Sequence, residues 1–220
     1  MAIQFIFIII FFILLGVLLF AEEKENAKIR YVCMTLLMPL LLLYYIFGVP
    51  PNSINGLIIV AVIFGYLGDL FLMFHKEKLF IFGLGSFLFG HIFYIIAFLL
   101  SLKNIAAFPL WGLLFVLPSI AVIIKVFRKT QGKLGDIQIP IYFYMGVIFV
   151  MGFCAILRLA ELNVLSFFLV WLGANLFILS DGMIALNKFD EEFPHAELYI
   201  KITYVLAQFF IVQGIVLAAL

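Results

Sequence analysis

Long apolar runs dominate the chain, and short polar breaks separate them. A helix that crosses a bilayer needs about 20 apolar residues, because each residue rises about 1.5 Å against a hydrocarbon core of about 30 Å. The runs are continuous rather than alternating, which favours helices over strands. The pattern predicts an all-α membrane protein, a single domain over residues 1–220 with about eight transmembrane helices. The predicted spans are 2–20, 29–48, 54–74, 79–101, 107–127, 137–158, 163–187 and 196–217.

Composition supports this prediction. Of the 220 residues, 67% are hydrophobic and 11% are charged, whereas globular chains average roughly 25% charged residues. The excess apolar surface therefore faces lipid. The net charge of +1 and the absence of a basic block argue against nucleic acid as a partner. The first run, 2–20, lacks a basic segment before it and a small-residue cleavage site after it, so we expect a retained span rather than a signal peptide.

Lysine and arginine are distributed unevenly between the two sets of loops. Ten lie in or beside the loops that follow the first, third, fifth and seventh spans, and only Lys103 and Arg158 lie in or beside the opposite loops. Loops rich in these residues stay in the cytosol. The bias predicts that both termini are non-cytosolic and that Lys201 begins the last span from the basic side. The ten residues are Lys24, Lys28, Arg30, Lys76, Lys78, Lys125, Arg128, Lys129, Lys133 and Lys188.

Two of the 12 carboxylates, Asp69 and Asp181, lie well within predicted spans. A carboxylate in the hydrocarbon costs about 2.5–3.5 kcal/mol on insertion scales, so such residues usually face the bundle interior and mark a function. Each Asp lies five or six residues before the predicted inner end of its span, which is ~7–9 Å below the cytosolic edge of the core. A packing hydrogen bond between helices is the alternative. Two carboxylates at matched depth favour a functional site near the cytosolic face.

The fourth span brings His91 and Tyr94 toward the same level, three residues apart and so on one helical face. Gly83 and Gly90 lie near that face, where small residues allow two helices to approach closely. A single histidine in a helix is usually a packing residue. His91 is the only deep histidine and has Tyr94 beside it, so we predict a functional role for it.

The last two spans add further polar side chains. Tyr204 and Gln208 lie four residues apart on one face of the last span, and Lys201 lies a turn earlier. Asn175 and Ser180 add polar atoms to the seventh span, beside Asp181. Each of these residues either binds or orients a substrate, or links two helices through a hydrogen bond, and the sequence leaves both interpretations open.

The two halves of the chain are weakly similar. Gly68-Asp69-Leu-Phe-Leu corresponds to Ser180-Asp181-Gly-Met-Ile, and a short basic turn follows each. A polar pair then follows each Asp after about 22–23 residues. This pattern suits a parallel duplication of four spans, a 4+4 pseudo-repeat.

Four stretches of the sequence resemble a known family, the YhhN-like lysoplasmalogenases. Their order and spacing fit the family, and the eight-span layout covers the whole chain. One departure is Met38-Pro39, where the family often has Lys-Pro. The stretches are Gly65-Tyr66-Leu-Gly-Asp69-Leu-Phe-Leu-Met73, Phe89-Gly-His91-Ile-Phe-Tyr94, Gly173-Ala-Asn175-Leu-Phe-Ile-Leu-Ser180-Asp181 continuing to Ala185-Leu-Asn-Lys-Phe189, and Thr203-Tyr204-Val-Leu-Ala-Gln208.

The resemblance implies hydrolysis of the vinyl ether bond of lysoplasmalogens to a fatty aldehyde and glycerophosphoethanolamine or glycerophosphocholine. It makes Asp69 and Asp181 the essential acids. Vinyl ethers hydrolyse when an acid protonates the carbon beta to the oxygen and water attacks the resulting oxocarbenium ion. A protonated and an ionised carboxyl group suit this chemistry, as in glycosidases. Since a Brønsted acid is sufficient, we expect neither a metal nor another cofactor.

The other candidate residues have supporting roles in this interpretation. His91 joins the catalytic pair, and Lys201 or Arg128 meets the lipid phosphate. The partners are then a lysophospholipid substrate and the surrounding membrane lipids. Residues expected to bind or orient substrate or water are Tyr66, Tyr94, Asn175, Ser180, Tyr204, Gln208 and Lys201.

Three other functions are compatible with two deep carboxylates. An intramembrane aspartyl protease would carry Gly-x-Gly-Asp, whereas this chain has one more residue between Gly65 and Gly68. A metal-dependent lipid hydrolase would use His91 and the two Asp residues as ligands, although the sequence has no HxxxH pair. A proton-coupled transporter would use the carboxylates as a relay. Turnover by the purified protein separates an enzyme from a transporter.

Overall fold

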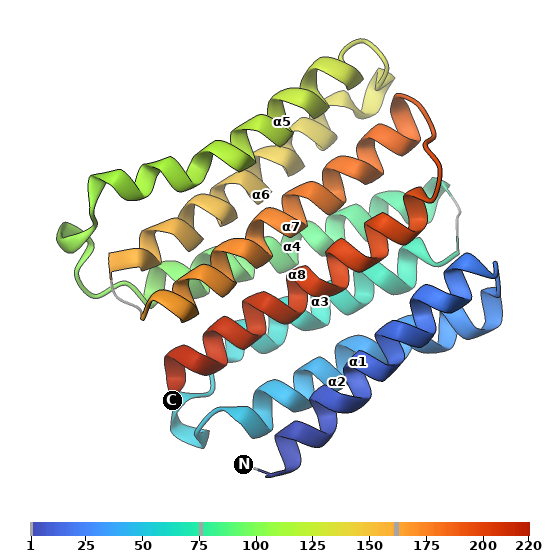
Figure 1. Ribbon diagram of the computed structural model, residues 1–220. Coiled ribbons are helices and arrows are strands. Elements are labelled where there is room, and N and C mark those ends of the chain that lie inside the picture. Colours follow the sequence, from blue (N-terminus) through green and yellow to red (C-terminus); the bar gives the residue numbers. More distant parts are fainter. Residues whose placement is uncertain (1, 75–76, 161–162) are drawn as a thin grey trace. The chain divides into compact units, whose positions relative to one another are not determined.

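Helices form nearly all of the described chain. The computed structural model describes residues 2–74, 77–160 and 163–220. Within these residues it contains eight α-helices and no strand, as the apolar pattern predicts (Figure 1). The helices are α1 (Ala2–Glu23), α2 (Ala27–Gly48), α3 (Gly56–Leu72), α4 (Glu77–Leu100), α5 (Leu117–Thr130), α6 (Gln138–Leu157), α7 (Val164–Phe189) and α8 (Ala196–Ala219).

The helices match the predicted spans to within a few residues at most ends. Seven described segments are long and apolar enough to cross a membrane, one of them the continuous stretch Leu110–Thr130, in which a 3₁₀ segment leads into α5. Helix α3 is apolar but has only 17 residues, the lower limit for a spanning helix. The protein is therefore a multi-pass integral membrane protein.

Asparagine residues begin three of the helices. The side chain of Asn26 accepts a hydrogen bond from the backbone N–H of Ile29 at the start of α2. Asn55 caps α3 and Asn163 caps α7 in the same way. Such caps satisfy backbone N–H groups that have no partner within the helix. The polar breaks seen in the sequence thus fix where these helices begin.

Large apolar side chains are exposed along the helices. Phe5 of α1, Leu114 of the segment before α5 and Phe143 of α6 are all more than half exposed. Exposed apolar surface on this scale is foreign to soluble monomers, and in a spanning helix it is the face that meets lipid.

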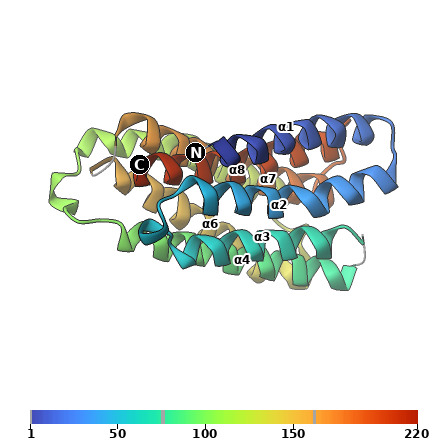
Figure 2. The ribbon, with the colours of Figure 1, turned by 90° about the horizontal axis from the view of Figure 1, so that it is seen from below.

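The chain forms two compact units. One comprises residues 1–97 and 215–220, and the other comprises residues 98–214. In the first unit α1 packs along α2, and α2 contacts α3 (Figure 2). In the second unit both α5 and α6 pack against α7. The boundary falls close to the middle of the predicted 4+4 repeat, but the repeat and the single-domain assignment both stay predictions.

Arg158 and Lys76 both contributed to the predicted orientation of the termini. Arg158 was counted as a loop residue, but only 4% of it is exposed, and its guanidinium lies 5.0 Å from the centre of the Phe98 ring. It is therefore a buried residue at the end of the sixth span rather than a solvated loop cation. Lys76 lies outside the described residues. The predicted orientation of the termini stays a prediction.

Candidate functional site

Asp69 lies in the last turn of α3, where it is 5% exposed. Helix α4 packs closely against α3 in this region, because glycines lie at the contact between the two helices. A Cβ atom at Gly68 would lie 2.6 Å from Cζ of Phe87, and one at Gly90 would lie 3.1 Å from the carbonyl oxygen of Ala61. Real Cβ atoms essentially never make contacts below 3.0 Å. Because Gly68 has no side chain, the Phe87 ring of α4 packs against the backbone of α3 beside Asp69.

His91 and Tyr94 are buried on α4, each with only 1% of its surface exposed. Neither is an isolated polar group, because each takes part in a hydrogen bond, ring contact or electrostatic interaction. Tyr45 of α2 is near enough to Tyr94 for the two hydroxyl groups to interact electrostatically. The Tyr45 hydroxyl also accepts a hydrogen bond from the backbone N–H of Asn55, at 2.9 Å. The first unit therefore holds buried polar side chains on α2, α3 and α4.

Asp181 lies in α7 with 8% of its surface exposed, and it faces α6. The hydroxyl of Tyr144, in α6, donates a hydrogen bond to Oδ2 of Asp181. Tyr144 is itself buried, with 3% exposed. This bond fixes the Asp181 side chain toward α6 and occupies one of its two oxygens.

Tyr204 and Gln208 are buried on α8, which packs tightly against α7. Tyr204 is close enough to Tyr144 for their hydroxyl groups to interact, and its ring meets Phe177 edge to face with centroids 5.6 Å apart. A Cβ atom at Gly173 would lie 2.7 Å from the carbonyl oxygen of Ala207 on α8. The second unit thus brings Asp181, Tyr144 and Tyr204 together from three helices.

The structure gives Asn175 and Ser180 hydrogen bonds that link helices. Asn175 accepts from the Ser119 hydroxyl on α5 at 2.9 Å and donates to the carbonyl oxygen of Trp171 at 2.9 Å. Ser180 donates to the carbonyl oxygen of Ile200 on α8, at 3.1 Å. These bonds favour the packing interpretation that the sequence left open, and a contact of either residue with substrate stays a prediction.

Lys201 lies at the start of α8 and pairs with Glu197 on the same helix, with Nζ 2.7 Å from Oε2. An ion pair at this spacing is only weakly stabilising. Arg128 is exposed in the last turn of α5, and Tyr66 is half-buried on α3. These observations do not test whether Lys201, Arg128 or Tyr66 contacts a substrate, so that role stays a prediction for all three.

The two carboxylates occupy different positions in their helices. Asp69 comes three residues before the last residue of α3, whereas Asp181 comes eight residues before the last residue of α7. Asp69 belongs to the first unit and Asp181 to the second. Their matched depth does not follow from the helix ends, and their action as a pair stays a prediction.

Metal binding has no obvious place among the described residues. Within residues 2–74, 77–160 and 163–220, no group of three or more His, Cys, Asp or Glu residues is arranged to hold a metal ion. Catalysis without a metal stays a prediction.

The sequence reasoning missed Tyr144 and Tyr45. Both are tyrosines within apolar helices, where a phenol counts as an apolar residue until its neighbours are known. One signal was available for Tyr144, since Ile141, Tyr144, Met145 and Ile148 recur at helical spacing. These four residues are all buried.

Comparison with known proteins identifies a family. A model described as the YhhN family matches residues 29–215, a stretch that includes every candidate site residue named above. No curated protein and no solved structure matches the chain.

Proposed function

Because this chain belongs to the YhhN family, we propose that it is a membrane-embedded hydrolase that cleaves the vinyl ether bond of lysoplasmalogens. The products are a fatty aldehyde and glycerophosphoethanolamine or glycerophosphocholine. The substrate already lies in the bilayer, which suits a protein whose candidate chemical groups all lie in or beside its spanning helices.

The observation that carries the proposal is the buried carboxylate of Asp181 with the Tyr144 hydroxyl bonded to it. Ionisable residues inside a membrane are expensive and are usually functional. A helix-packing role needs only a polar group, whereas acid–base chemistry needs an ionisable one. Family membership then selects the reaction among those that carboxyl groups catalyse.

We propose that Asp69 supplies the proton and Asp181 acts as the ionised partner. Asp69 transfers its proton to the carbon beta to the ether oxygen, and an oxocarbenium ion forms. Asp181 stabilises this cation and accepts a proton from the attacking water. The resulting hemiacetal collapses to the aldehyde and the glycerol hydroxyl, so that one water is consumed. The Tyr144 hydroxyl supports this assignment because it donates a hydrogen bond to the carboxylate that is proposed to face the cation.

The proposal is tested by incubating purified protein with a panel of lysophospholipids and measuring aldehyde release by mass spectrometry. We expect cleavage of vinyl ether lipids but not of the corresponding acyl or alkyl lipids. Folded Asp69→Asn and Asp181→Asn variants should lose about 10²–10⁴ in turnover, the usual contribution of a positioned acid or base. The double variant should be little worse than the worse single variant, since groups that act as one unit are non-additive.

An alternative outcome refutes the catalytic assignment. If Asp69 and Asp181 only connect helices, asparagine replaces them at a cost of about 1 kcal/mol in stability, and turnover is unchanged. Absence of any lipid cleavage by folded wild-type protein, together with proton-coupled uptake into vesicles, would establish the transporter alternative instead.

A further inference from the structure

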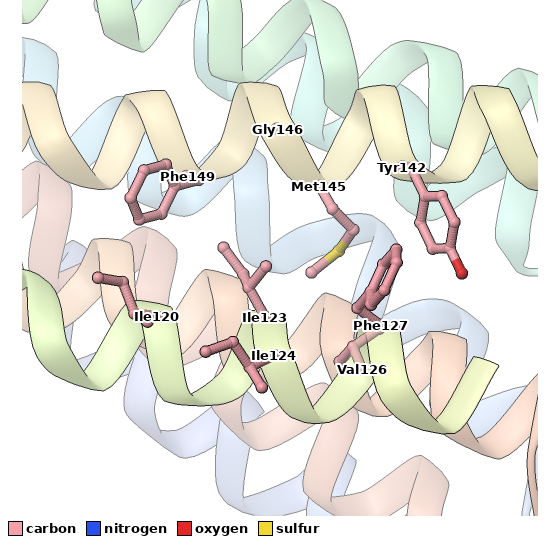
Figure 3. A pocket seen from close by; sticks show the side chains of 9 residues that line it. All are labelled: Ile120, Ile123, Ile124, Val126, Phe127, Tyr142, Met145, Gly146 and Phe149. Atoms are coloured by element: carbon pink, nitrogen blue, oxygen red, sulfur yellow. The ribbon is translucent and has the colours of Figure 1, made fainter. Parts of the chain in front are cut away.

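An apolar groove of about 300 Å³ lies between α5 and α6, both in the second unit. Five residues of α5 and four of α6 line it, and Figure 3 shows Ile123, Phe127 and Met145 reaching into the space between the two helices. Phe149 and Ile120 lie at one end, and Tyr142 and Phe127 lie at the other. Apart from the Tyr142 hydroxyl, the lining side chains are hydrocarbon or thioether.

The groove opens toward the lipid-exposed surface of α5 and α6. Ile124 and Phe127 on its wall are 43% and 46% exposed. Gly146 lines the α6 side, and a side chain added there would meet nothing within 4 Å. In a spanning segment, a groove of this composition takes up hydrocarbon rather than water.

The Tyr142 end of the groove leads to a group of cations. This basic end consists of Lys125, Arg128, Lys129 and Lys133, in or just after the last turns of α5. Asp190 pairs with two of them, with Oδ1 2.5 Å from Nζ of Lys133 and Oδ2 3.7 Å from Nζ of Lys129. Lys125 and Arg128 are exposed on α5, and cations in this position complement a phosphate group.

The inner wall of the groove is shared with the candidate site. Val126 packs against Gly182, the residue after Asp181, so closely that a Cβ atom there would lie 3.1 Å from Cγ2 of Val126. Met145, which lines the groove, is the next residue after Tyr144, whose hydroxyl donates to Asp181. The groove therefore runs along the section of α6 that carries Tyr144, and its wall residue Val126 contacts α7 one residue after Asp181.

We propose that the α5–α6 groove binds the hydrocarbon chain of a single-chain phospholipid, with the phosphate at the basic end. This inference rests on the proposed function for the identity of the lipid and deepens it by assigning the chain-binding site. The ether bond joins the chain to glycerol, so it lies where the groove meets the basic end, on the α5–α6 side of the helix that carries Asp181. The groove is then the part of the protein that sets chain-length preference.

Photolabelling locates the chain without requiring catalysis. The probe is a 1-O-alkyl lysophosphocholine with a diazirine at the end of its chain, which has no vinyl ether bond. With full-length protein in nanodiscs, we expect labelling concentrated on residues 120–127 and 142–149. Labelling spread equally over the exposed face of α1 would overturn the proposal.

A glycine substitution provides the matched comparison. Gly146→Leu fills the groove and should reduce labelling of these segments about tenfold, the effect of excluding roughly two methylene groups. Gly16→Leu is the control, because Gly16 is also an exposed helical glycine with nothing within 4 Å of an added Cβ, but it lies on α1. If Gly146→Leu fails to fold, Phe149→Ala lengthens the groove and should shift preference to longer chains. Equal labelling profiles for folded wild type, Gly146→Leu and Phe149→Ala would refute the site.

Activity measurements separate this inference from the proposed function. In Gly146→Leu, kcat/KM should fall about tenfold for long-chain vinyl ether lipids and stay unchanged for the shortest chain. Groove labelling by a protein that cleaves no vinyl ether would retain the lipid site and reject the proposed reaction. Cleavage without groove labelling, or with unaltered chain-length preference in Gly146→Leu, would retain the reaction and reject the groove.

Discussion

Replacing Tyr144 by phenylalanine tests whether Asp181 is a catalytic carboxylate. The change removes one hydroxyl group, which donates a hydrogen bond to Oδ2 of Asp181. Both side chains are buried, so bulk water does not replace the lost donor. A hydrogen bond to a charged group contributes about 1.5–3 kcal/mol. At 1.36 kcal/mol per factor of ten, loss of this bond in the transition state lowers kcat by about 10- to 150-fold.

The same substitution also lowers stability, because a buried acceptor that loses its donor costs about 1–3 kcal/mol. Thermal unfolding in detergent is therefore measured beside aldehyde release. Tyr31→Phe is the matched control, since Tyr31 is exposed on α2 and loses the same hydroxyl group. We expect this control to retain both stability and turnover.

A double-variant cycle separates positioning from packing. Tyr144→Phe should have a large effect on kcat in the wild type and almost none in Asp181→Asn, where the catalytic carboxylate is already absent. If Tyr144→Phe lowers the melting temperature but leaves kcat unchanged, Tyr144 only supports the fold. If its effect on kcat is the same in both backgrounds, Tyr144 does not act through Asp181.

Four further predictions address packing, charge, metal and orientation. Gly173→Ala should lower the melting temperature, because the added Cβ lies 2.7 Å from a backbone oxygen of α8. Gly16→Ala, where the added Cβ meets open space, should leave the melting temperature unchanged or raise it. Equal effects of the two substitutions would refute the close packing of α7 and α8. The Lys133 ammonium, followed by Lys129, lowers the pKa of Asp190, so the stability that this carboxylate contributes is present above its ordinary pKa of about 3.9 and lost as pH falls through its lower folded value. The melting-temperature difference between wild type and Asp190→Asn should therefore disappear in more acidic solution and shrink in high salt, and a difference independent of both would contradict the ion pairing. Turnover should survive chelation, and activity that chelation abolishes and zinc restores would show a metal requirement. A C-terminal reporter active only in the cytosol should stay silent, because the basic loops predict non-cytosolic termini, and a signal would reverse the orientation.

Spanning helices were predictable because hydropathy is a local property of the sequence. The largest differences arise where polar and apolar residues intermingle at a span end. Residues 54–74 were predicted to span, but Asn55 caps a helix that ends at Leu72. The fifth span begins with a 3₁₀ segment at Leu110 rather than at residue 107, and it continues to Thr130. Capping and turn geometry, not hydropathy, decide these ends.

The polar side chains of the site were predictable by type but not by partner. Asp69, His91 and Asp181 are buried, as the cost of a polar group in lipid requires. Ser180 and Asn175 lie near Asp181 in sequence, yet one bonds to α8 and the other to α5. These partners depend on how each helix is rotated about its axis, and a helix that is apolar on every side carries no pattern that reveals its rotation.

In helix α6, the rotation of the helix about its axis decides which residues have a proposed function. Tyr142 and Tyr144 are two residues apart and so face different directions on a helix. Residue type does not distinguish them, yet Tyr144 bonds to Asp181 and Tyr142 lines the lipid-facing groove. One helix therefore carries the proposed chemistry on one face and the proposed chain site on another. Substitutions on the two faces should then have separable effects. Tyr144→Phe should lower kcat equally for all chain lengths, because every substrate uses the same carboxylate. Gly146→Leu should discriminate among chain lengths, because only long chains fill the groove.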